Sequence, residues 1–126
     1  SGRESSRAEM SAEQVKALQS TLDRLIQDEK VYLDNDLSQA DLAVKMGLSR
    51  HQLSELLNTH LNESFYDLIN RHRVREAANL LSCTDSAVLD IAFEAGFNNK
   101  NTFNRYFKQY MGVTPTQFRG AHSCAA

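Results

Sequence analysis

The chain has 126 residues, a net charge of −2 and 41% hydrophobic residues. This length favours one domain, or two very small ones with a shared core, and the composition is adequate for a globular fold. No apolar run approaches the roughly 20 residues of a membrane-spanning helix and no signal-peptide pattern opens the chain, so we expect a cytoplasmic protein without a membrane segment. The two distant cysteines, Cys83 and Cys124, exclude a disulfide framework and a CxxC zinc site, and we expect Cys83 to be half-buried.

Residues 1–10 are polar, do not begin with Met and lack periodicity, and we interpret them as a linker or a cloning scar. From Ser11 onward the apolar residues recur at steps of three and four, which predicts a helix that ends before the stretch "LDNDLS". These apolar positions are Val15, Leu18, Leu22, Leu25 and Ile26.

A helix-turn-helix is predicted over about residues 37–61. Ser38 is a suitable N-cap with Asp41 at the third helical position, and Gly47 suits the end of this helix. Ser49 then offers a second cap, and Gln52 completes a capping-box pattern. Two short helices separated by so short a turn form this motif.

A longer helix is predicted over about residues 64–82, where buried-type residues alternate with Arg71, Arg73 and Arg75. The segment after it repeats the first motif. "LAVKMGL" (42–48) matches "IAFEAGF" (91–97) at an offset of 49 residues, and after one inserted residue the offset becomes 50. The chain therefore contains a second predicted helix-turn-helix, over about residues 86–111.

The repeat places exposed-type polar residues at positions one, two, five and six of each second helix. Residues there can reach base edges in the major groove, where Arg or Lys suits guanine and Asn suits adenine. They are Arg50, His51, Ser54 and Glu55 in the first unit, and Lys100, Asn101, Asn104 and Arg105 in the second. The alternative is an ordinary solvated face, but asparagines are poor helix formers that such a face would normally avoid.

Charge is unevenly distributed along the chain. Residues 1–36 hold five Lys/Arg and eight Asp/Glu, a net of −3, whereas residues 37–126 hold nine and eight, a net of +1. The segment from Gly96 to Arg119 carries four cations and no acidic residue. The prediction of nucleic-acid binding therefore depends on where the cationic residues lie and not on the net charge of the chain.

Four further residues are candidates for phosphate contact: Asn99, Lys108, Arg119 and Arg73. For Arg73 we favour a structural role, through a carboxylate or the backbone. Glu55 stands where its repeat mate is Arg105, and a carboxylate near phosphates weakens binding unless it accepts from a cytosine amine. We therefore expect the second unit to carry more of the affinity.

Other classes of function find less support. The chain has no phosphate-cradling glycine loop, no supported Ser/His/Asp constellation and no HExxH, so we expect no enzyme, catalytic residue, metal site or cofactor. A pure protein-interaction module would show an exposed apolar patch instead of Asn, Lys and Arg at the helix N-termini.

The stretch "GFNNKNTFNRYFKQYMGVTPTQFR" resembles the signature of the AraC/XylS family of bacterial transcription regulators, and the similarity extends over about residues 32–119. The resemblance implies an all-α domain of about seven helices over 11–120, with a tail at 121–126. It implies two helix-turn-helix subdomains, bridged by the long helix, that read adjacent major-groove segments of double-stranded DNA. It also implies an activator that contacts RNA polymerase, and a separate N-terminal sensing or dimerisation domain outside this fragment.

Overall fold

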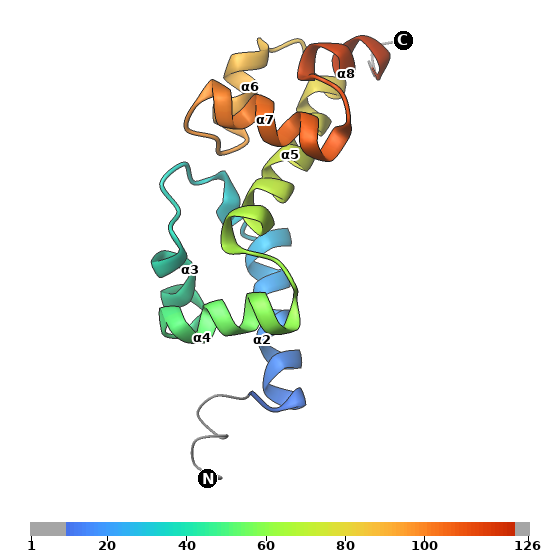
Figure 1. Ribbon diagram of the computed structural model, residues 1–126. Helices are drawn as coiled ribbons and strands as arrows, with labels where there is room; N and C mark the ends of the chain where they lie inside the picture. Colours follow the sequence, from blue (N-terminus) through green and yellow to red (C-terminus); the bar gives the residue numbers. More distant parts are fainter. Residues whose placement is uncertain (1–9, 123–126) are drawn as a thin grey trace. The chain divides into compact units, whose positions relative to one another are not determined.

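The computed structural model describes residues 10–122, which fold into seven α-helices without a strand (Figure 1). The described chain forms two compact units. The first unit contains residues 10–30 and Ser38–Phe65, and the second contains Val31–Leu37 and the chain from Tyr66 onward. The expectations for residues 1–9 and 123–126, including Cys124, lie outside the described residues.

The first unit is a small helical bundle whose helices are fixed by local caps. Ser11, Ser38 and Ser49 each form a capping box, in which the serine side chain and the side chain three residues later satisfy backbone amides reciprocally. Leucines and other apolar residues of these helices are buried together. The helices are α2 (Ala12–Gln27), α3 (Gln39–Met46) and α4 (Arg50–Glu55).

The helix that begins at Arg50 changes its winding after Glu55. Leu56–His60 form a π-helical segment, η2, which the sequence pattern did not predict. Leu56 and Leu57, at the start of this segment, are both buried. The segment ends where Leu61 donates its amide to the carbonyls of Leu56 and Leu57, both at 3.2 Å.

The second unit surrounds a core of aromatic rings. Phe97, Phe103, Phe107 and Phe118 form a chain of contacts with successive centroid distances of 5.2, 5.7 and 5.6 Å. Aromatic pairs of this kind add stability beyond the area they bury. The elements of this unit are the 3-10 turn η1 (Val31–Leu33), α5 (Phe65–Cys83, with Phe65 in the first unit), α6 (Val88–Glu94), α7 (Lys100–Met111) and α8 (Pro115–Ala121).

The all-α class, the two helix-turn-helix motifs and the long intervening helix are confirmed. Cys83 is exposed, so the expectation of a half-buried thiol was wrong: it is the last residue of α5. Between residues 10 and 122, none of the helices combines the length and the apolar character that membrane crossing requires.

Candidate nucleic-acid interface

The polar residues predicted on α7 gather on its outer side. Asn99 caps the helix, because its side-chain oxygen accepts the amide of Thr102 at 2.8 Å. Lys100, Asn101 and Arg105 are exposed, and Asn104 is half-buried. The opposite side of the helix is anchored by the buried rings of Phe103 and Phe107.

Arg105 has a defined neighbour. Its guanidinium lies over the ring of Tyr106, 5.2 Å from the centroid, and Tyr106 stacks on Tyr110 at 6.1 Å. A guanidinium on an aromatic face is attracted by the ring quadrupole and loses part of its rotational freedom. The arginine is therefore partly oriented before any ligand arrives.

The corresponding face of α4 offers fewer unengaged groups. Arg50 and His51 are exposed at its N-terminus, and Glu55 is half-buried. The Ser54 hydroxyl already accepts a hydrogen bond from Gln39 Nε2 at 2.6 Å, which ties α4 to α3. Three of the four predicted positions of this unit thus present side chains without a described hydrogen bond.

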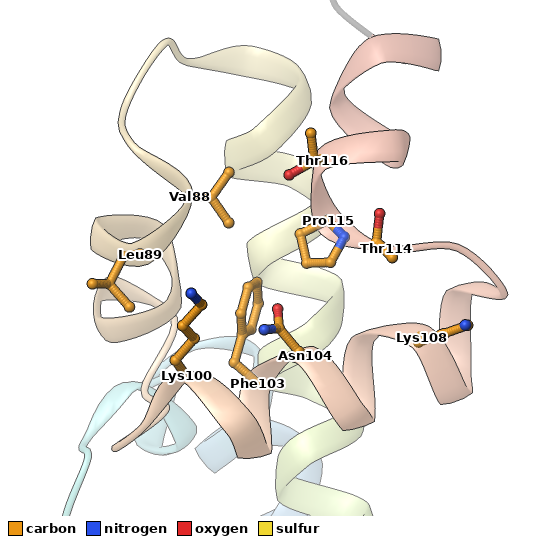
Figure 2. Close-up of a pocket in the computed structure, with 9 residues that line it drawn as sticks. All are labelled: Val88, Leu89, Lys100, Phe103, Asn104, Lys108, Thr114, Pro115 and Thr116. Atoms are coloured by element: carbon orange, nitrogen blue, oxygen red, sulfur yellow. The ribbon is translucent and has the colours of Figure 1, made fainter.

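The second unit has an open groove at the place where the first unit has the hydrogen bond between Gln39 and Ser54. Val88 and Asn104 are the repeat mates of Gln39 and Ser54, and both line a groove of about 600 Å³. Figure 2 shows Lys100, Asn104 and Lys108 along α7 on one side of it, with the start of α8 on the other. Sequence reasoning missed the contribution of α6, with Val88 and Leu89, and of the start of α8, with its cap Thr114 and residues Pro115 and Thr116.

The groove combines cationic and apolar chemistry. Its two lysines are exposed and none of its described lining residues is acidic, while Leu89 contributes a side chain that is 45% exposed. Such a surface suits a polyanion with apolar faces between its charges, as in a sugar–phosphate backbone. The amide of Asn104 lies between the lysines and completes a donor-rich edge.

The arginine Arg73 lies inside the fold. Its side chain is 9% exposed and donates from Nε to the Tyr32 carbonyl at 2.6 Å and from Nη2 to the Asp34 carbonyl at 2.8 Å. Nη1 reaches Asn70 Oδ1 at 3.3 Å. Burial lowers the pKa of Arg73 and the Asp34 charge opposes this shift, so the guanidinium remains protonated at neutral pH. These bonds match the structural role and leave no exposed face for phosphate.

Arg119 is also engaged within its unit. Its Nε donates to the Leu81 carbonyl at 3.2 Å and its Nη2 to the Thr84 carbonyl at 3.0 Å. The residue therefore fastens α8 to the end of α5, where unpaired helix carbonyls need donors. Of the predicted phosphate candidates, Asn99 and Lys108 remain exposed at the surface. The described residues contain no cluster of three or more side chains suited to holding a metal ion.

Comparison with known proteins agrees with the two helix-turn-helix motifs of the fold. A family model described as a helix-turn-helix domain matches residues 42–121. An uncharacterized HTH-type transcriptional regulator of Staphylococcus aureus is 33% identical over 91 residues, which are 72% of this chain and 12% of that protein. The chain spans less than half of the length of the curated relatives it matches.

Solved structures share the fold. The C-terminal domain of AraT, a response regulator from Geobacillus stearothermophilus, superposes with a TM-score of 0.72 at 27% identity, covering 88% of this chain and 87% of that one. The DNA-binding domain of the global transcriptional factor AdpA, solved with a target DNA, has a TM-score of 0.71 at 20% identity over 82% of this chain and 90% of its own. The family match and the paired helix-turn-helix motifs lead to one conclusion: the chain belongs to the AraC-type helix-turn-helix family of DNA-binding transcription regulators, and not to a family of enzymes.

Proposed function

We propose that the chain binds double-stranded DNA sequence-specifically, with α4 and α7 each reading one of two adjacent major-groove segments. The observation that carries this proposal is the repeated polar face: exposed or half-buried residues occupy equivalent positions at the start of each second helix. Helix N-termini present their backbone amides and first side chains together, which suits both phosphate and base edges.

We assign different DNA contacts to the polar faces of α7 and α4. On α7, Lys100, Asn101, Asn104 and Arg105 read bases, while Lys108, which lines the groove, and the exposed Asn99 amide contact phosphates. On α4, Arg50 and His51 supply most of the contacts, because the Ser54 hydroxyl is already bonded to Gln39. Each good bidentate contact discriminates against a wrong base by about 1–3 kcal/mol.

Selection from a random duplex pool tests this proposal. We expect a motif of two blocks about one helical turn apart. A variant with Asn101 and Arg105 both changed to Ala should lose one block, and a variant with Arg50 and His51 both changed to Ala should lose the other. Recovery of no motif, with affinity no better than for random DNA at physiological salt, would refute the proposal.

We further propose that the native protein activates transcription by contacting RNA polymerase in the cytoplasm, and that this chain follows a sensing or dimerisation domain. The support is the resemblance to AraC/XylS regulators and the greater length of the curated relatives. Run-off transcription from a promoter that carries the selected site tests the first part, since a fall in transcript would indicate repression. The mass of the native protein, detected with an antibody against this chain, tests the second.

A further inference from the structure

The turn between α6 and α7 is held by a residue from far upstream. The Asn35 side-chain amide donates to the carbonyl of Phe97 at 2.9 Å and to that of Phe93 at 3.2 Å. One carbonyl belongs to the last turn of α6 and the other precedes the Asn99 cap of α7 by two residues. One amide nitrogen thus bonds to carbonyls on the two sides of this turn.

The same upstream segment packs closely against the turn. A Cβ added to Gly96, whose φ is +106°, would lie 2.1 Å from the Tyr32 carbonyl oxygen and 2.7 Å from Arg73 Nε. Arg73 in turn binds the carbonyls of Tyr32 and Asp34, so it fixes the segment on both sides of Leu33. The Tyr32 ring stacks on His72 with centroids 5.7 Å apart.

The turn of the first helix-turn-helix, residues 47–49, receives no hydrogen bond from a side chain outside the motif in the described part of the chain. This turn contains Gly47, and a Cβ added there would meet nothing within 4 Å. The two helices of this motif are tied directly by the bond between Gln39 and Ser54. In the second motif the repeat mates of that pair are Val88 and Asn104, which form no such bond and line an open groove instead. The second turn therefore depends on contacts from outside the motif.

We propose that Asn35 and Arg73 are positioning residues that set the placement of α7 for base reading. Recognition requires side chains held within about 0.5 Å of the productive geometry by supporting hydrogen bonds. The inference rests on the proposed function and deepens it, because both residues act through the backbone carbonyls they bind. Asn35 holds the carbonyls that frame the turn, and Arg73 holds the segment that carries Asn35.

The test compares Asn35→Ala and Asn35→Asp with the control Gln27→Ala, which removes an exposed amide of the first unit without changing charge. Affinity is measured for a panel of duplexes with single base changes in each block, at a temperature where circular dichroism shows every variant fully folded. We expect discrimination in the α7 block to fall by about tenfold, with the α4 block unchanged. Asn35→Asp should be the more severe change, because a carboxylate would face two carbonyls.

A stabilising role alone would leave discrimination intact in the folded variants, or would lower affinity equally for both blocks, and either result would overturn the inference. Backbone amide resonances of the free protein provide a second readout. In Asn35→Ala those of residues 96–101 should shift, while those of residues 49–54 stay in place. This readout needs no DNA: if the wild-type protein selects no motif but the shifts occur, the proposed function fails, while Asn35 is still shown to hold the start of α7 in place. Absence of the shifts would refute the positioning role whatever the DNA result.

Discussion

The two helix-turn-helix motifs share a pattern of residues but are stabilised in different ways. Each turn closes with the same backbone bond, from Leu48 to Ala43 at 2.8 Å in the first and from Phe97 to Ala92 at 3.0 Å in the second. The first motif is then completed internally by a side-chain bond between its helices. The second is completed by Asn35, Tyr32 and Arg73, which lie outside it.

This difference has a consequence for DNA reading. The bond between the two helices of the first motif uses the hydroxyl of Ser54, a residue of its proposed reading face. The second motif leaves the equivalent Asn104 without a described hydrogen bond, beside a groove with two lysines. Asn104 is thus open to a ligand in the second motif, whereas the Ser54 hydroxyl oxygen of the first motif already accepts a hydrogen bond from Gln39.

The largest expected effect is a difference in stability between substitutions at the two turn glycines, Gly96 and Gly47. Gly96→Ala should lower the free energy of unfolding by about 3–5 kcal/mol, because strain at positive φ adds to a clash with the Tyr32 backbone carbonyl. Gly47→Ala should lose only about 1 kcal/mol, since its surroundings are open and its φ of +72° is left-handed helical. Urea unfolding followed by circular dichroism measures both. Equal losses would show that the upstream segment does not press on the second turn.

The helix caps of the first motif, which depend on residues close together in the chain, could be predicted from the sequence. The caps at Ser38 and Ser49 are confirmed, because their partners lie three residues away and the pattern is visible in the chain. The support of the second turn could not be predicted, since the two carbonyls bound by Asn35 lie 58 and 62 residues along the chain. Nothing in a local pattern indicates which loop amide will meet them.

The arginines illustrate the same limit. Arg73, Arg105 and Arg119 all fall in helices with exposed-type neighbours, and charge alone marks all three as DNA contacts. Only Arg105 is exposed, whereas the other two bind backbone carbonyls more than 30 residues away. The π-helical segment Leu56–His60 was missed because the spacing of its leucines fits an α-helix equally well.

The next largest effect concerns specificity. Arg105→Ala should reduce discrimination at one or two base pairs of the α7 block by about 1–3 kcal/mol, because a guanidinium fork is lost. Arg105→Lys keeps the charge without the fork and should restore affinity more than discrimination. Competition binding with single-base variants of the selected site measures both. A uniform loss over every sequence would assign Arg105 to phosphate.

Lys108, unlike Arg105, should contribute affinity without base discrimination. Lys108→Ala should weaken binding evenly across sequences and reduce the slope of log K against log salt by about one, because one released counterion is lost. Gln109→Ala, at the next exposed position of α7, serves as the uncharged control and should leave the slope unchanged. Binding isotherms at several salt concentrations test this. A base-specific loss would place Lys108 among the reading residues.

The smallest expected effect concerns the first motif, which we expect to bind DNA more weakly than the second. Glu55 is half-buried on the proposed reading face of α4, at the position that Arg105 occupies in the second motif. If its carboxylate only faces phosphate, Glu55→Gln should tighten binding to random DNA by about 0.5 kcal/mol, or two- to threefold. Asp23→Asn, an exposed position on α2, changes the net charge equally and controls for that change. If Glu55→Gln instead abolishes preference for one cytosine, the carboxylate accepts from the base amine and the first motif reads sequence through it. That outcome would contradict the expectation that Glu55 only weakens the first motif. The carboxylate would then be a source of that motif's sequence specificity.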